Sequence, residues 1–514
     1  MNKQRRLENV IKNSALGVIA QGTNVLLSLI VRTVFIRCLS AEYLGINGLF
    51  TNILTMLSLA EMGVGSAIVY SMYKPVAESD EVQIAKLMNL YRLAYAVIGC
   101  VVAFVGIGLI PFLDVLIRGS VLVDNLTLIY LLFLSNTVFS YFFAYKRSIF
   151  SADQHERILH AFRILFHFLR AIVQIVILIV FRNFVLYLIV QIVCTGLENV
   201  SISVYADKKY PFLVKYRNKR MTKAERKPIF DNIKALFIYK IGSTVLDGTD
   251  NIIISAFDGV ISVGLLSNYT LITGSLQSLM SQVVNSVIGS VGNFVAKEKK
   301  EKYEGLLNRL TFLYFVIYGM MFIGLYAVMN PFISVWAGPE YVLNDFTVFV
   351  HGLNVYIFGM MNSVWTFRST MGLFVHGRWR PLISAVINVV VSIWWAKYFG
   401  LIGVLLGTTF TRVVTNVWYD PFIVYHFGLE KNPYRYYLRW FGYLAVVMLN
   451  IFVLDGIKHK LVFEGLLGCF IYGMISVVLF GCMVTAIYAR SEEYKYMIVT
   501  MRNVLKKVSA KLIR

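Results

Sequence analysis

The segment GINGLFTNI at residues 45–53 recurs in modified form as GLLSNYTLI at residues 264–272, about 219 residues further along the chain. The same offset, or one residue more, also aligns Asn89 with Asn308 and Pro111 with Pro331. Each match is weak alone, but a near-constant offset across three separate segments predicts an internal repeat. We therefore expect two structurally equivalent halves.

The composition indicates a membrane protein. Hydrophobic residues make up 58% of the 514 residues and charged residues only 15%, too few charges to keep the surface of so long a chain in water. Apolar runs of about 20 residues, the length that crosses hydrocarbon as a helix, recur along the chain. A barrel requires strands of alternating polarity, and runs such as residues 175–181 do not alternate. The sequence predicts an all-α polytopic membrane protein.

The apolar runs predict about fourteen transmembrane helices. They are placed at residues 15–38, 46–72, 88–113, 125–145, 160–181, 184–206, 235–257, 262–290, 310–335, 347–370, 381–399, 401–425, 437–455 and 464–489. The five cysteines are scattered and never spaced as CxxC. They therefore predict neither a disulfide framework nor a metal site.

Basic residues collect in alternate gaps between these helices. One set of gaps, which includes both ends of the chain, holds about 39 of the 49 Lys and Arg residues, and the other set holds about five. The positive-inside rule places the first set and both termini in the cytoplasm. Topology and attraction to anionic headgroups thus account for the net charge of +21. The basic loops are short and carry no nucleic-acid-binding pattern, so no nucleic-acid partner is expected.

The repeat and the longest basic loop divide the chain. Six predicted helices separate the repeated segments, and an even number restores the same membrane orientation, so the halves are parallel and related by an axis along the membrane normal. We predict two six-helix lobes around a central cavity, followed by two further helices. The divisions are an N-lobe (1–206), a cytoplasmic basic linker (207–234), a C-lobe (235–425), two extra helices (426–489) and a cytoplasmic amphipathic tail (490–514).

Several segments together carry a family resemblance. They are RTVFIR at 32–37, EYLGINGLFTNIL at 42–54, LSLAEMGVGSA at 57–67, YKP at 73–75 and LDGTDNIII at 246–254. This set resembles bacterial polysaccharide-export flippases of the Wzx type, in the multidrug/oligosaccharidyl-lipid/polysaccharide (MOP) superfamily. The similarity extends over most of the first twelve helices, whereas the last two are generic apolar spans.

The resemblance implies a two-lobed transporter that alternates between inward- and outward-open states. It also implies a substrate, undecaprenyl-diphosphate-linked oligosaccharide, which such proteins move across the bacterial plasma membrane for cell-surface polysaccharide biosynthesis. We expect a monomer that contacts membrane lipids and polysaccharide-assembly proteins, and we do not expect an enzyme.

Arg32 is the first candidate for binding a diphosphate. It lies past the middle of the first helix, where a charge is costly unless it is functional or paired. A guanidinium group can bind a phosphate through two hydrogen bonds. The alternatives are an ion pair with Asp247 or Asp250 of the seventh helix, which would act as a gate, and simple packing.

The fifth helix offers a polar stripe. His160, Arg163, His167, Arg170 and Gln174 follow a 3-4-3-4 spacing and share one helix face. The stripe should face a cavity or an acidic partner such as Glu198, although His160 and Arg163 could also mark the cytoplasmic boundary. This helix has no His pair with i,i+4 spacing and no nearby Cys, so a metal site is not expected. Arg412 should face inward, whereas Arg37 and Arg368 are interpreted as interface anchors.

Acidic groups could serve in ion coupling or gating. Asp247 and Asp250 share a face of the seventh helix and could bind a coupling Na⁺, exchange H⁺ or neutralise Arg32. The repeat offset matches Arg32 with Asn251, which joins this group. Glu61, beside Gly63 and Gly65, could bend its helix, hydrogen-bond within it or take part in coupling. No other cofactor is expected.

Two transport functions agree with the sequence. Several buried cations favour a lipid-linked oligosaccharide flippase. An acid-lined cavity would instead favour an ion-coupled multidrug or small-solute exporter of the same fold. A glycosyltransferase or polymerase would need a sizeable outward loop, and no outward gap exceeds about a dozen residues. A channel is disfavoured because no pore-loop pattern is present.

Overall fold

The chain is an all-helical, multi-pass membrane protein. The computed structural model describes residues 3–61, 64–117, 125–227, 229–230, 233, 244–245, 248–373, 376–461, 463 and 465–512. Within these ranges every regular element is a helix. The chain divides into two compact units, which are residues Met1–Leu271 (unit 1) and Ile272–Arg514 (unit 2).

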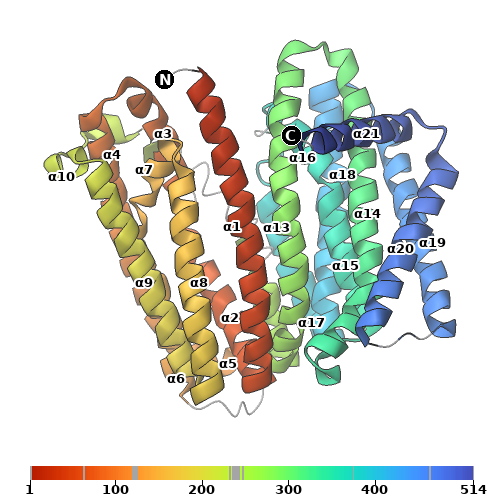
Figure 1. The fold of residues 1–514 in the computed structure, drawn as a ribbon, viewed down its shortest axis with the longest axis horizontal. Helices are drawn as coiled ribbons and strands as arrows, with labels where there is room; N and C mark the ends of the chain where they lie inside the picture. The colour runs from red at the N-terminus through yellow and green to blue at the C-terminus, as the bar shows by residue number, and fades with distance from the viewer. Residues whose placement is uncertain are drawn as a thin grey trace. The chain divides into compact units, whose positions relative to one another are not determined.

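Unit 1 is a bundle of long helices (Figure 1). Its elements are α1 (Lys3–Cys38), α2 (Ala41–Leu57), the 3₁₀ segment η1 (Ser58–Glu61), α3 (Val64–Glu78), α4 (Glu81–Gly108), the 3₁₀ segment η2 (Ile110–Phe112), α5 (Leu113–Leu116), α6 (Leu126–Ala144), α7 (Arg147–Ala152), α8 (Glu156–Phe181), α9 (Phe184–Lys209), α10 (Phe212–Lys215), α12 (Asp250–Asp258) and the first part of α13 (Val260–Lys297). Helix α8 packs against both α1 and α9, and α6 packs against both α4 and α9.

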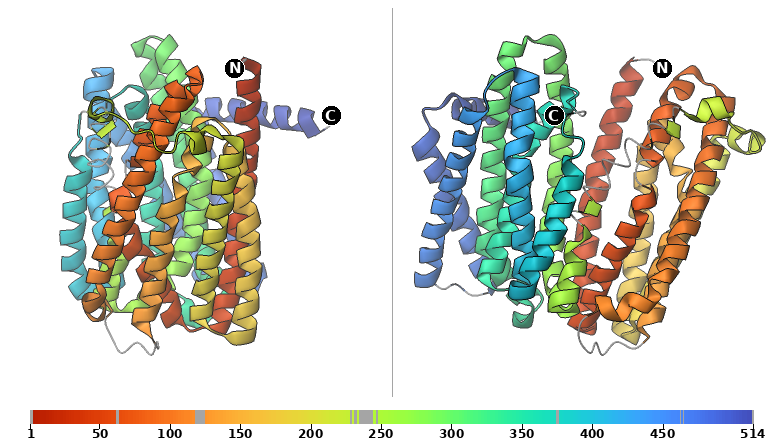
Figure 2. Two further views of the ribbon diagram at one scale, coloured as in Figure 1. Left: turned by 90° about the vertical axis from the view of Figure 1, so that its left-hand side faces the viewer. Right: turned by 180° about the vertical axis from the view of Figure 1, so that it is seen from behind.

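Unit 2 is organised around the long helix α14 (Tyr303–Trp336), whose apolar stretch is its most buried span. The other elements are η3 (Lys300–Lys302), η4 (Pro339–Tyr341), α15 (Asp345–Met360), α16 (Asn362–Thr370), α17 (Arg380–Arg412), the π-helical segment η5 (Val413–Val417), α18 (Trp418–Ile423), the π-helical segment η6 (Val424–Leu429), α19 (Tyr434–Lys460), α20 (Gly465–Tyr488) and α21 (Glu492–Leu512). Helix α14 packs against α15, α19, α20 and α21. Figure 2 shows α21, in dark blue, running roughly at right angles to the long helices of this unit.

Ten segments of the described residues are long and apolar enough to cross a membrane, judged by length and composition. Among the other predicted helices, the one at residues 235–257 is described only in part, because residues 235–243, 246 and 247 lie outside the described ranges. The predicted pair 381–399 and 401–425 counts as one segment, but Gly400 has φ 57° and ψ −132° and separates two helices there. The gap that the sequence predicts between these two helices is therefore confirmed.

Two predicted helices are interrupted, so their prediction as single helices was wrong. The predicted helix 46–72 is divided, because α2 ends at Leu57 and the chain passes through η1 before α3 begins. The predicted helix 347–370 is divided between α15 and α16. At that break the side-chain amide of Asn362 donates to the Tyr318 hydroxyl (3.1 Å) and to the Gly359 carbonyl (3.0 Å).

The two copies of the repeated segment cross each other within unit 1 at their matched glycines. A Cβ atom on Gly45 would lie 1.9 Å from the backbone oxygen of Val260. A Cβ atom on Gly264 would lie 2.6 Å from the backbone oxygen of Ala41 and 3.0 Å from the backbone nitrogen of Gly45. Glycine is therefore required on both helices, because any side chain would displace backbone atoms that cannot rotate away.

We expect Gly45→Ala to lower the free energy of unfolding by about 1–3 kcal/mol, since the added methyl group overlaps a backbone carbonyl. The measurement is the melting temperature of the purified protein in detergent. Gly22→Ala is the matched control, because a Cβ atom at Gly22 of α1 meets nothing within 4 Å. Equal melting temperatures for wild type and Gly45→Ala would contradict the close crossing.

Candidate functional site

A polar cavity lies within unit 1, bounded mainly by α1, α2, α8 and α9. Its volume is about 430 Å³. The polar lining residues are Asn24, Ser28, Arg32, Asn47, Thr51, His167, Arg170, Gln174, Tyr187 and Gln191, and the apolar ones are Leu27, Val31, Phe35, Leu44, Ala171 and Leu271. A polar chamber between helices that cross a membrane is a candidate binding site, because burying polar groups without a ligand or water is costly.

The Arg32 side chain extends from α1 into the cavity, and hydrogen bonds hold it close to Gly264, where α2 and α13 cross. Its Nη1 donates to the Ser267 hydroxyl on α13 at 3.1 Å, and that hydroxyl donates to the Gly264 carbonyl at 2.7 Å. Arg32 forms no ion pair with an acidic side chain in the described part of the chain. Asp247, one of its two predicted partners, lies outside the described residues.

The predicted stripe of α8 faces α1 over much of its length. The His160 ring lies 3.3 Å from where a Cβ atom on Gly17 would stand, and one heptad further the His167 Nδ1 and Asn24 Oδ1 are 2.7 Å apart. The amide of Gln174 donates to the Tyr187 carbonyl on α9 at 3.3 Å. Helices α1 and α8 therefore hold Arg32, His167 and Arg170 around one chamber.

The charge of the chamber is positive. Two guanidinium groups, Arg32 and Arg170, are among its lining residues, which include no Asp or Glu. Carboxamide, hydroxyl and imidazole groups surround these cations and can donate further hydrogen bonds. Such a lining is suited to an anion with several acceptor oxygens, for which charge-assisted hydrogen bonds are strong.

The other predicted binding residues do not line this chamber. Arg163 is exposed on α8. Arg412 lies in unit 2, where its Nη1 donates to the Asn354 carbonyl at 2.9 Å and its guanidinium is 5.5 Å from the centre of the Phe358 ring. Of the residues predicted to bind substrate, Arg32, His167 and Arg170 are thus brought together, whereas Arg163 and Arg412 are not.

The predicted coupling groups are also placed elsewhere. Asp250 and Asn251 begin α12 and are partly buried. Glu61 is in η1, and its carboxylate accepts a hydrogen bond from the hydroxyl of Tyr95, which in turn accepts from Tyr91 at 2.9 Å. Glu61 is therefore joined to α4 by this hydrogen bond. No group of His, Cys, Asp and Glu suited to holding a metal occurs among the residues that were described.

Glu198 pairs with a residue outside the α8 stripe, so of the two predicted surroundings of the stripe the structure shows the cavity. The Glu198 carboxylate accepts a hydrogen bond from Arg147 of α7 at 2.8 Å, and the same Arg147 nitrogen donates to the Asn199 side chain at 2.8 Å. Because Arg147 neutralises Glu198, the acid does not reduce the positive charge contributed by Arg170.

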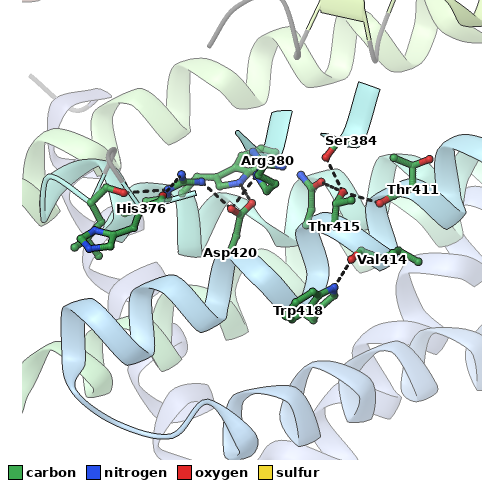
Figure 3. A network of polar contacts seen from close by, with 12 residues as sticks. His376, Arg380, Ser384, Thr411, Val414, Thr415, Trp418 and Asp420 are labelled. Carbon is green, nitrogen blue, oxygen red and sulfur yellow. Dashed lines mark hydrogen bonds and ion pairs between the residues drawn. The ribbon is translucent and has the colours of Figure 1, made fainter. Parts of the chain in front are cut away.

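Arg368 is buried in an ion-pair network of unit 2, so the prediction that it extends to the membrane interface was wrong. Its Nη1 donates to Asp420 at 2.7 Å and its Nη2 to the His376 carbonyl at 2.7 Å. The same Asp420 carboxylate also pairs with Arg380, whose Nε lies 3.2 Å away (Figure 3). The Asp420 side chain is 0% exposed and also accepts from the Trp365 indole at 2.9 Å.

Sequence reasoning missed several members of both sites. Asn24, Ser28 and Arg32 recur every four residues on α1, a spacing that places them on one helix face. That spacing was a usable signal for the chamber. Asp420 is a single acid in an apolar stretch. Because a charge within the membrane is costly unless it is paired, its position also indicated a buried partner.

Comparison with known proteins supports the fold. No family model matches the chain, and no curated protein matches it either. Solved structures do match, and they show that the chain has the fold of MOP-superfamily transporters.

Three of these structures illustrate the similarity. The lipid II flippase MurJ, in an inward closed conformation, matches with a TM-score of 0.67 at 14% sequence identity, over 92% of this chain and 98% of that chain. An inward-facing multidrug resistance MATE family transporter of the MOP superfamily matches with a TM-score of 0.57 at 15% identity, over 79% and 98%. A MOP superfamily transporter from Pyrococcus furiosus matches with a TM-score of 0.51 at 14% identity, over 83% and 97%.

Proposed function

We propose that the protein is a flippase that moves undecaprenyl-diphosphate-linked oligosaccharide units across the bacterial plasma membrane, for cell-surface polysaccharide biosynthesis. The observation that carries this proposal is the chamber of unit 1, which is lined by two arginines and no carboxylate. A diphosphate is an anion rich in acceptor oxygens, and a glycan is rich in hydroxyl groups. Guanidinium groups suit the first, and the Asn, Gln and Ser side chains of the chamber suit the second.

The proposed cycle is alternating access, with the diphosphate bound by Arg32 and Arg170. His167 is held by Asn24 and supplies a further nitrogen to the chamber. Arg412 is proposed to meet the substrate outside this chamber, and the exposed Arg163 to mark the cytoplasmic boundary. Both ends of the chain are proposed to be cytoplasmic, and the protein is proposed to act as a monomer with polysaccharide-assembly proteins as partners.

Coupling to Na⁺ or H⁺ is proposed to use the remaining acidic groups. Glu61 is suited to proton exchange because Tyr95 and Tyr91 continue its hydrogen bonding into α4. Asp250 and Asn251 lie together at the start of α12, and with Asp247 they form the proposed gating or cation-binding group.

The alternative is an ion-coupled multidrug or small-solute exporter. The similarity to MATE family transporters supports the shared fold, but a chamber with two arginines and no acid repels the cations that an acid-lined cavity would attract. The flippase is therefore preferred.

A transport assay with the purified protein in liposomes distinguishes the two functions. We expect an undecaprenyl-diphosphate-linked oligosaccharide to become accessible to a lectin on the opposite leaflet only when the protein is present. Liposomes loaded with a lipophilic cationic dye should lose it no faster than protein-free liposomes. Dye efflux without movement of the glycan lipid would favour the exporter and overturn the flippase.

A further inference from the structure

A second cavity of unit 1 is lined by four arginines. It lies between α4 and the linker that follows α10, and its volume is about 540 Å³. The lining residues are Asn89, Leu90, Arg92, Leu93, Ala96, Arg217, Arg220, Met221 and Arg226. None of them lines the chamber around Arg32. No acidic residue is present in this lining, so its charge is strongly positive.

None of the four arginines forms an ion pair with a carboxylate within the part of the chain that the structure describes. Arg226 Nε donates to the Met221 carbonyl at 3.0 Å, which leaves its two terminal nitrogens available. Four guanidinium groups around one cavity repel each other, so the arrangement is stabilised by a bound anion.

The acids near this cavity are engaged with lysines. Lys146 Nζ is 2.6 Å from the Asp207 carboxylate. Glu225 accepts hydrogen bonds from the Thr222 amide at 2.6 Å and from Lys86 at 2.9 Å. The Thr222 backbone N–H and the Lys86 ammonium hold the pKa of Glu225 down at about 2, so this carboxylate stays ionised and paired at neutral pH.

Side-chain contacts between α4 and the linker stabilise the shape of the cavity. The side-chain amide of Asn89 donates to the carbonyls of Tyr216 (3.0 Å) and Lys219 (2.9 Å). Lys86, one turn before Asn89 on α4, forms an ion pair with Glu225, which lies in the linker just before the lining residue Arg226. Two attachments of the linker to one helix fix the position of Arg217 and Arg220 relative to Arg92 and favour a preorganised site.

An exposed apolar stripe continues from the cavity along α4. Leu93 lines the cavity and is exposed, and Val97, Val101 and Phe104 follow on the same helix face, with Phe104 81% exposed. The charge distribution places the start of α4 at the cytoplasmic side of the membrane. A ligand that carries both a phosphate and a long apolar chain would match the cavity and the stripe together.

We propose that the four-arginine cavity binds the phosphate headgroup of an anionic membrane lipid, whose acyl chain lies along the stripe from Leu93 to Phe104. The site is separate from the transport chamber and does not depend on the proposed substrate. A headgroup bound here holds the linker on α4 and thereby connects α9 and α10 to the membrane surface. Basic clusters next to a membrane helix commonly bind such headgroups.

Native mass spectrometry of the purified full-length protein tests this site. Mixed micelles supply phosphatidylglycerol and phosphatidylcholine in equal amounts, and retained lipid is counted for each variant. We expect wild type to retain phosphatidylglycerol. The double variant Arg217→Gln with Arg220→Gln should retain at least about tenfold less of it. Both arginines are exposed, so this variant should fold, and its gel-filtration profile is compared with that of wild type.

The matched control is Lys223→Gln with Lys227→Gln, which removes the same charge from exposed linker residues that do not line the cavity. An equal loss of lipid from the arginine and lysine variants would overturn the site, because it would show general surface attraction. Equal retention of phosphatidylcholine and phosphatidylglycerol by wild type would overturn it as well. Displacement of the lipid by an excess of inorganic phosphate would assign the cavity to soluble phosphate and contradict the lipid.

Discussion

Arg32→Ala and Arg170→Ala should each stop measurable export of a lipid-linked glycan while leaving the amount of protein in the membrane normal. Both side chains line the chamber of unit 1, where no acid competes with a bound anion. A hydrogen bond to a charged group contributes about 1.5–3 kcal/mol. Loss of one guanidinium therefore corresponds to about a tenfold to hundredfold loss in affinity for the diphosphate.

The measurement is surface polysaccharide in cells that depend on this chain for export, with membrane levels checked by immunoblot. Arg163→Ala is the matched control, because it removes an exposed arginine of α8 that does not line the chamber. Full activity of Arg32→Ala and Arg170→Ala would contradict the anion site. Recovery of export when Asp250→Ala is added to Arg32→Ala would instead favour the gating pair.

Asp420→Asn should be the most destabilising of the single substitutions considered for unit 2. It leaves Arg368 and Arg380 without their counter-charge, although the two side chains are only 6% and 10% exposed. Breaking a buried ion pair by removing one partner costs about 3–5 kcal/mol. Arg380→Ala should cost less, because it leaves the Arg368–Asp420 pair intact.

The melting temperature in detergent and the yield from membranes measure this order. Arg378→Ala is the control, since Arg378 is exposed and lies 5.6 Å from the centre of the Trp379 ring. We expect Asp420→Asn to melt lowest, Arg380→Ala next and Arg378→Ala close to wild type. Equal melting temperatures for Asp420→Asn and Arg378→Ala would show that the network does not stabilise unit 2.

Most of the fold could be predicted because apolar runs of spanning length leave few alternatives to membrane helices. Gly400 was also predicted as a boundary, since it stands between two apolar runs, and its φ of 57° in the structure confirms the boundary. The break after Leu57 was not located, although a bend at Glu61 was one of the alternatives, because residues 46–72 form a long, mainly apolar run that contains no proline. Only the structure shows that Ser58–Glu61 forms a 3₁₀ segment.

The candidate site could be predicted only in part. Arg32 and Arg170 were found because charges in apolar sequence are costly and therefore stand out. Neutral residues such as Asn24 give no such signal, although Asn24 holds His167. The partner of Arg368 was missed because Asp420 lies 52 residues away, and sequence alone does not show which helices meet.

Binding of the diphosphate by the purified protein tests the chamber most directly. Affinity is measured for an undecaprenyl-diphosphate-linked oligosaccharide and for an analogue that lacks the diphosphate, using wild type, Arg32→Ala and Arg163→Ala. We expect wild type and Arg163→Ala to prefer the diphosphate lipid, and Arg32→Ala to lose that preference by about tenfold or more. Equal affinity of all three proteins for the diphosphate lipid and for its analogue would contradict an anion site at Arg32.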